Sequence, residues 1–161
     1  MKNLFLILCS IFLFINCKND DDTKAGAILE NKMTFRNKET TWRNYCYYKD
    51  FEVNEISFNL TGTNYYDEIK FQFFGIEISE LGGTYTFHSD PNDPQYNPES
   101  NFYKAIINHR LEENAETQDF LINGGTVEVE IIGENIKINF DLETSAGPAI
   151  GHFEGSFIEN N

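Results

Sequence analysis

The sequence predicts an all-β fold, an antiparallel β-sandwich or barrel of roughly eight to ten short strands. The first observation behind this prediction is that apolar and polar residues alternate with a period of two from Ile28 onward. Such alternation is typical of strands that have one face on a core and the other in water. The second observation is that short turn signals, rich in glycine and asparagine, separate these runs.

The segments that alternate in this way are the expected strands. In chain order they are residues 28–35, 40–48, 53–60, 69–73, 84–88, 102–108, 127–131, 136–142 and 150–158. The alternation is clearest in 127–131 and 136–142, and the Gly-Glu-Asn turn at 133–135 between them predicts a hairpin. Residues 37–38 are expected to turn the first pair of strands.

Two glycine pairs and one ambiguous segment complete the pattern. The glycine pairs at 82–83 and 124–125 each precede a strand and predict bulges or tight entries. Residues 111–117 could form a helical turn, but they lack an apolar stripe, so a loop is expected there.

The chain begins with a segment that predicts a signal peptide rather than part of the fold. Lys2 gives a positive start, and residues 4–15 are apolar apart from Ser10. This run is shorter than the about 20 apolar residues that a membrane-spanning helix needs. We therefore expect a signal peptide at 1–16, a tether at 17–27 and one β domain at 28–161.

The sequence Phe14-Ile15-Asn16-Cys17 follows the apolar run directly. It resembles the bacterial lipobox, in which an aliphatic and a small residue precede a lipidated cysteine, although Asn16 replaces the usual Gly, Ala or Ser. The resemblance implies acyl chains on Cys17. Since each buried methylene contributes ~0.8 kcal/mol, two or three chains would anchor the protein stably in a membrane.

Polar and acidic residues follow the cysteine, and they predict a disordered tether. The residues concerned are Lys18, Asp20, Asp21 and Asp22. They resemble the surface-export signal of Bacteroidota lipoproteins, which implies an outer-membrane lipoprotein displayed outside the cell. The alternative is the periplasmic face of that membrane.

Charge and cysteine content limit the possible functions further. The formal charge is −14, and loss of residues 1–16, which hold Lys2 and no acid, would lower it by one. Such an acidic chain is a poor candidate for nucleic acid, because phosphate binding relies on clustered Lys and Arg. Cys9 would leave with the signal peptide and Cys17 would carry lipid. Cys46 then has no disulfide partner and is expected to be a small buried apolar residue.

Three short sequences near the predicted strands suggest a family. They are Gly83-Thr84-Tyr85-Thr86-Phe87, Gly125-Thr126-Val127-Glu128-Val129 and Gly151-His152-Phe153-Glu154-Gly155-Ser156-Phe157. They resemble the "GTYTF" strand and the "GTVxI … GxFxGxF" closing strands of small uncharacterised Bacteroidota lipoproteins. The resemblance implies an all-β lipoprotein domain of unknown function, and it carries no catalytic residues with it.

Candidate contact residues are aromatic or acidic. The possible ligand contacts are Trp42, Tyr47, Tyr65, Tyr66 and Tyr96, because exposed Tyr and Trp anchor protein or sugar partners. Half-buried tyrosines in a sheet are the alternative. In the proline-containing loop 89–99, the side chains of Asp90, Asn92 and Asp93 offer oxygen ligands for a weak calcium site. The alternative for this loop is a stiff, solvated connection.

The histidines and the sequence motifs indicate no catalytic reaction. The histidines lack a metal-type pair, and we expect His88 and His152 to be surface or strand-end residues. No nucleophile motif or phosphate-binding glycine loop is present, and no cofactor is expected. The sequence thus favours a non-enzymatic binding domain with an unknown surface protein or glycan as partner. A calycin-like carrier of a small apolar ligand is the alternative, its barrel lined by Phe71, Phe73, Val129 and Phe140. A hydrolase based on scattered carboxylates ranks last.

Overall fold

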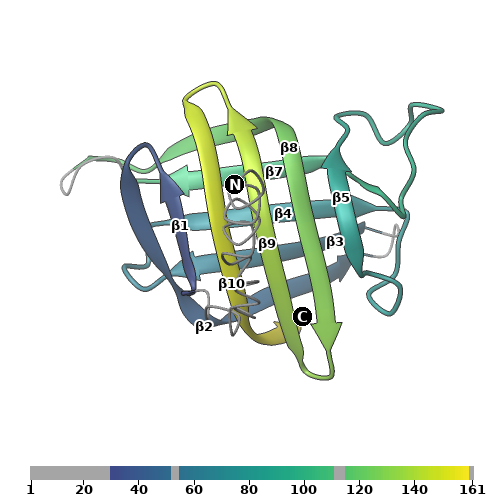
Figure 1. The fold of residues 1–161 in the computed structure, drawn as a ribbon, viewed down its shortest axis with the longest axis horizontal. Coiled ribbons are helices and arrows are strands. Elements are labelled where there is room, and N and C mark those ends of the chain that lie inside the picture. Colours follow the sequence, from purple (N-terminus) through teal and green to yellow (C-terminus); the bar gives the residue numbers. More distant parts are fainter. Residues whose placement is uncertain (1–29, 52–54, 111–114, 160–161) are drawn as a thin grey trace, which may run out of the picture.

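The computed structural model describes residues 30–51, 55–110 and 115–159, and it confirms the all-β class. These residues contain no helix, and ten strands form one mostly antiparallel sheet that closes in a ring (Figure 1). The strands are β1 (Lys32–Phe35), β2 (Lys38–Phe51), β3 (Glu55–Gly62), β4 (Glu68–Phe74), β5 (Gly83–Phe87), β6 (Asn101–Phe102), β7 (Lys104–His109), β8 (Gln118–Ile132), β9 (Asn135–Thr144) and β10 (Gly147–Glu159).

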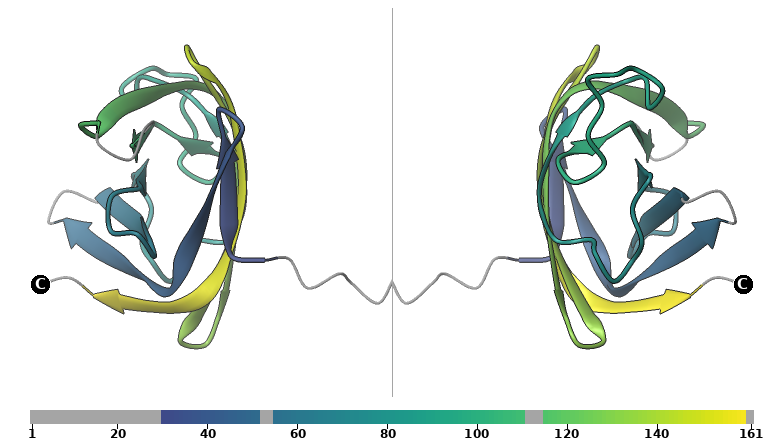
Figure 2. Two further views of the ribbon diagram at one scale, coloured as in Figure 1. Left: turned by 90° about the vertical axis from the view of Figure 1, so that its left-hand side faces the viewer. Right: turned by 90° about the vertical axis from the view of Figure 1, so that its right-hand side faces the viewer.

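The ring has two walls whose strands cross. One wall consists of β1, β10, β9, the second half of β8 and β5, and the other of β2, β3, β4 and β7 (Figure 1). Figure 2 shows the walls from the side, curving around the space that the core occupies. The ring closes because β9 pairs with β8 while the end of β10 runs parallel to β2. In crossed walls of this kind, the inner faces of the two walls pack against each other.

Long strands pass from one wall to the other at bends. β8 pairs with β7 over residues 118–121 and then with β9, and its register shifts between Ile122 and Gly124. The predicted irregularity at the glycine pair 124–125 is therefore confirmed. β10 pairs first with β9 and then, from Ser156, with β2. A Cβ atom on Gly155 would overlap the backbone of Asn44, so only glycine allows this crossing.

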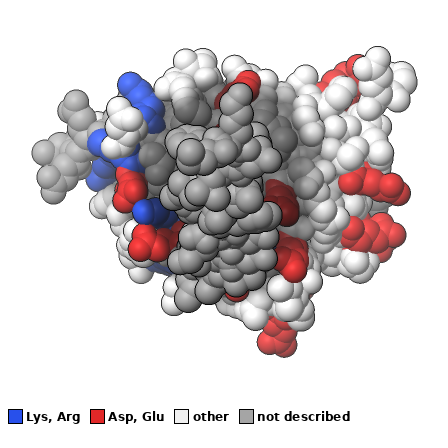
Figure 3. All heavy atoms as spheres, viewed as in Figure 1, with Lys and Arg blue, Asp and Glu red and all other residues white. Residues whose placement is uncertain are grey.

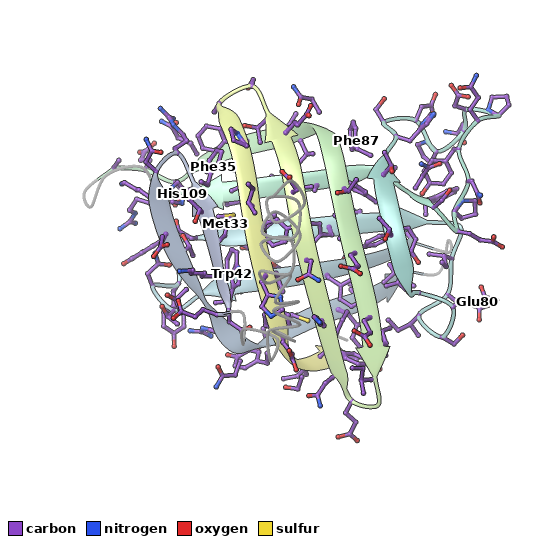
Figure 4. The ribbon with its side chains drawn as sticks, viewed as in Figure 1. Met33, Phe35, Trp42, Glu80, Phe87 and His109 are labelled. Atoms are coloured by element: carbon purple, nitrogen blue, oxygen red, sulfur yellow. The ribbon has the colours of Figure 1, made fainter. Side chains whose placement is uncertain are left out.

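The interior of the ring is filled with apolar side chains. Phe71 on β4 and Phe140 on β9 belong to opposite walls, yet their ring centroids are 5.4 Å apart. Phe73 and Tyr85 meet edge to face at 4.9 Å. The side chains at Met33, Phe35 and Trp42 complete the core on the β1–β2 side (Figure 4). Contact between opposite walls shows that apolar side chains pack against one another across the ring.

The predicted strands are present, with different bounds. The hairpin at 133–135 is confirmed, since Ile132 pairs with Asn135 across the turn from β8 to β9. β8 begins at Gln118, well before residue 127, where the predicted strand begins. The additional residues include 118–121, which pair with β7. Residues 28–29 of the first predicted strand and 111–114 of the predicted loop lie outside the described residues.

Cys46 lies in the core, as expected from the alternation. Its side chain is fully buried, and this burial raises the pKa of the thiol to about 12. We therefore expect Cys46 to resist alkylation at pH 8 in the native protein, because thiolates are the reactive form. Peptide mass spectrometry should detect modified Cys46 only after unfolding in denaturant. Equal modification of the native and unfolded protein would contradict this placement.

Candidate functional site

A turn between β3 and β4 presents two exposed tyrosines at one end of the barrel. Gly62 donates its N–H to the carbonyl of Asp67 at 2.7 Å, and this bond closes the turn. Within it, the Asn64 side-chain oxygen accepts the N–H groups of Tyr66 and Asp67 at 3.0 and 3.1 Å. Tyr65 is 74% exposed and Tyr66 50% exposed. The turn therefore holds both rings in water although they are large and partly apolar.

The buried carboxylate of Asp67 fixes this turn to two neighbouring strands. One carboxylate oxygen accepts the hydroxyl of Thr40 and the amide of Asn64, both at 2.8 Å. The other accepts the backbone N–H of Arg110 at 3.0 Å. Asp67 is only 4% exposed. Because these donors come from β2, from the turn and from the residue that follows β7, Asp67 joins three parts of the barrel end.

The side chain of His109 lies beside this carboxylate and is buried as well. Its Nδ1 is 2.9 Å from Asp67 Oδ1, yet without the alignment of a hydrogen bond, so the contact is electrostatic. The ring meets Phe35 edge to face at 5.5 Å. Burial acts to raise the pKa of Asp67, but the donors of Arg110, Asn64 and Thr40, together with His109, outweigh it. The net result is a lowered pKa, so Asp67 stays ionised at neutral pH.

Arginines stack on both exposed tyrosines. The guanidinium carbon of Arg43 is 3.4 Å from the ring centroid of Tyr65, and that of Arg110 is 3.4 Å from the ring centroid of Tyr66. Arg43 also donates to the Tyr45 hydroxyl at 2.7 Å. We call these five residues the tyrosine–arginine surface. Stacking of this kind contributes about 0.5–2 kcal/mol and restricts the rings before a partner binds.

The tyrosine–arginine surface borders a hollow of about 420 Å³ whose lining includes Lys38, Asn64, Tyr66 and His109. Lys and Arg side chains gather over β1 and β2 at this end of the molecule, next to acidic ones (Figure 3). Arg and Tyr are the residue types that dominate binding energy at protein interfaces. The barrel end thus combines exposed aromatic area, fixed side chains and mixed charge.

The structure brings together only some of the predicted contact residues. Tyr65 and Tyr66 lie side by side on the turn, and Tyr47 (36% exposed) meets Tyr45 edge to face at 5.5 Å. Trp42 is 2% exposed in the core, so its expected role as a ligand contact is corrected. Tyr96 lies at the other end of the barrel, where its hydroxyl is 3.2 Å from the carbonyl oxygens of Phe74 and Asn101.

Sequence reasoning missed both arginines of the tyrosine–arginine surface. Arg43 stands two positions before Tyr45 in the same strand, which is the spacing of side chains on one face. That spacing was a usable signal. Arg110 reaches Tyr66 across more than forty positions of sequence, and no local pattern predicts that contact.

The candidate calcium residues support the alternative of a stiff connection. Asp90 Oδ1 accepts the N–H of Asn92 at 2.9 Å, and Asp93 Oδ1 accepts the N–H of Gln95 at 2.8 Å. Both carboxylates therefore cap local turns. Across residues 30–51, 55–110 and 115–159, no group of three or more His, Cys, Asp or Glu could hold a metal ion.

We accordingly expect no calcium-dependent stabilisation. The melting temperature should be the same in millimolar calcium and in chelator, because a ligand that binds the native state raises it. Differential scanning calorimetry measures this directly. An increase that disappears in an Asp90→Asn variant would restore the calcium hypothesis.

The structure also places the two histidines expected at the surface. His88 is half-buried and meets the Tyr96 ring at 5.8 Å. His152 faces outward from β10, as the alternation predicts, but it is only 7% exposed, which corrects the expectation of an open surface residue. Its Nδ1 is 2.7 Å from the side-chain oxygen of Asn139.

Comparisons of this chain with protein-family models, with curated proteins and with solved structures find no match. The resemblance to Bacteroidota lipoproteins therefore stays a prediction. Cys17 and the predicted export signal at Lys18, Asp20, Asp21 and Asp22 lie outside the described residues. In the part of the chain that the structure does describe, no helix has the length and apolar character of a membrane span.

Proposed function

We propose that this chain is an outer-membrane lipoprotein, anchored through acyl chains on Cys17 and displayed at the cell surface, whose β-barrel is a non-enzymatic binding domain. A surface protein or a glycan binds at the tyrosine–arginine surface. The observation that carries the proposal is the pair of exposed tyrosines, each stacked on an arginine and held by a turn that a buried carboxylate fixes.

The packed interior supports binding at the outside of the barrel. A carrier needs an internal cavity of several hundred Å³ for its ligand. The side chains expected to line such a cavity, Phe71, Phe73, Val129 and Phe140, are at most 4% exposed and belong to one core cluster. This packing favours recognition at the surface over the carrier alternative.

The acidic residue at the barrel end does not support a hydrolase. A general acid at neutral pH needs a carboxyl group whose pKa is raised. The pKa of Asp67 is lowered instead, and its oxygens accept hydrogen bonds from the protein itself. Asp67 therefore serves to hold the turn.

Affinity capture tests the binding role. The mature lipoprotein and a Tyr65→Ala/Tyr66→Ala variant are used in parallel for pull-down from outer-membrane extracts and for glycan-array screening. We expect a partner that the wild type retains and the variant loses, because truncating two hot-spot aromatics costs at least about 2 kcal/mol. Leu121→Ala, a change at an exposed apolar residue elsewhere on the barrel, is the control. Turnover of a generic glycosidic or ester substrate would count against a pure binding role.

Mass spectrometry of the native protein tests the anchor separately. We expect a product that begins at Cys17 and carries acyl chains on it. Protease added to intact cells should digest the protein, whereas survival in intact cells and loss in lysed cells would place it on the periplasmic face. An unmodified Cys17 would contradict the lipoprotein assignment.

A further inference from the structure

The outer face of the wall that contains β8, β9 and β10 carries mostly polar side chains in two parallel rows. The first row consists of cross-strand partners on β5, β8, β9, β10 and β1, which are Thr84, Glu128, Asn139, His152 and Lys32. The second row runs beside it and consists of Thr126, Asp141, Ile150 and Thr34. Both rows line one groove of about 560 Å³, which lies on a different part of the molecule from the tyrosine–arginine surface.

Hydrogen bonds between neighbouring strands fix the middle of the first row. Asn139 donates its amide N–H to Glu128 Oε2 at 2.9 Å, and its amide oxygen lies 2.7 Å from Nδ1 of His152. The three side chains therefore form one chain of hydrogen bonds across β8, β9 and β10. A network between adjacent strands holds its members in place before a ligand arrives.

The network also determines which ring nitrogen of His152 carries the proton. A carboxylate can only accept, so Asn139 must turn its NH₂ group to Glu128 and its oxygen to His152. Nδ1 of His152 is then the donor, and Nε2 of the neutral ring is an acceptor. Burial and the nearby Lys137 lower the pKa of His152, against an opposing effect of Glu154, and this favours the neutral ring.

From these observations we propose that the groove binds a neutral saccharide, as a second binding site independent of the proposed tyrosine–arginine surface. The groove offers an excess of hydrogen-bond acceptors: the carboxylates of Glu128 and Asp141 and the Nε2 of His152. Acceptors on the protein require donors on the ligand, and sugar hydroxyl groups supply them at close spacing. Ile150, 54% exposed in the second row, provides apolar area for the C–H face of a sugar ring.

The same residues disfavour the other classes of small ligand. The carboxylates of Glu128 and Asp141 repel phosphate, sulfate and sialic acid, and the cation of Lys32 already lies 3.1 Å from both Glu30 and Glu39. A metal ion is disfavoured because the described residues contain no suitable group of three ligands. The hydroxyls of Thr34, Thr84 and Thr126 donate as well as accept, which suits the mixed character of a sugar hydroxyl.

The test is a glycan array with the full-length protein, purified in a detergent that lacks a sugar headgroup. The probes are neutral oligosaccharides of glucose, galactose and mannose, with sialylated and sulfated glycans beside them. We expect neutral glycans to bind, and Glu128→Gln to weaken them about tenfold, the loss expected for one hydrogen bond to a charged group. Thr126→Val should weaken them by a smaller factor, because a neutral hydrogen bond is worth less.

Matched variants separate this proposal from a general effect of charge or folding. Glu130→Gln removes the same charge two positions further along β8, where Glu130 faces outward beyond the groove, and it should bind like the wild type. All variants should melt at the wild-type temperature. The proposal is overturned if only charged glycans bind, or if Glu128→Gln and Thr126→Val bind neutral glycans like the wild type. It is also overturned if Tyr65→Ala alone abolishes neutral-glycan binding, a result that would leave the proposed function intact.

Discussion

Replacing Gly125 with alanine is expected to lower the free energy of unfolding by about 4 kcal/mol, or to prevent folding. Two costs add at this residue. Its φ of +105° lies where side chains other than glycine are strained. In addition, a Cβ atom would overlap the backbone of Asp141 and Leu142 on β9, which cannot move without breaking the β8–β9 pairing. Urea denaturation of the purified variant measures the loss.

Gly82→Ala is the control for this prediction. Gly82 precedes β5, and a Cβ atom there would meet no atom within 4 Å. We expect a change of less than about 0.5 kcal/mol, as for most surface substitutions. Equal stability of Gly125→Ala and Gly82→Ala would contradict the close approach of Gly125 to the backbone of β9.

The walls of the barrel could be predicted because burial follows a local pattern. Val127 and Val129 alternate with Glu128 and Glu130, and each valine is buried while each glutamate is exposed. Trp42 also lies on the inner face with Cys46, four positions further along β2, as the alternation predicts, although the register with β3 shifts between them and leaves Asn44 exposed. The expectation of a surface Trp42 followed residue type instead of this alternation, and for that reason it was wrong.

The closure of the ring and the barrel-end site could not be predicted in this way. Parallel pairing of Ser156 with Tyr45 joins segments more than a hundred residues apart, and neither segment contains a signal for the other. The contacts of Asp67 with Arg110 and Thr40 likewise link positions 43 and 27 residues apart. A single sequence shows each polar residue but not which buried partner it meets.

Asp67→Asn is expected to lower the free energy of unfolding at pH 7 by about 3 kcal/mol. Asparagine keeps the shape of the side chain, but in either orientation its NH₂ group would face a donor, either the Arg110 N–H or the pair from Thr40 and Asn64. The turn that holds Tyr65 and Tyr66 should loosen as a consequence. Denaturation curves of wild type and variant give the difference. Asp119→Asn is the matched control, since Asp119 is exposed and bonds only to Asn108 in the described hydrogen bonds.

The effect of Asp67 should also depend on pH in a defined direction. Its pKa in the folded protein is below the usual 3.8, so the native state binds the proton less readily than the unfolded chain. The stabilisation is thus fully present above pH 3.8 and is lost as the pH falls through the lower, folded pKa. The stability difference between wild type and Asp67→Asn should accordingly be constant near neutral pH and shrink in acid. A difference that grew in acid would mean that Asp67 is protonated in the native protein. The turn would then not be held by a carboxylate ion.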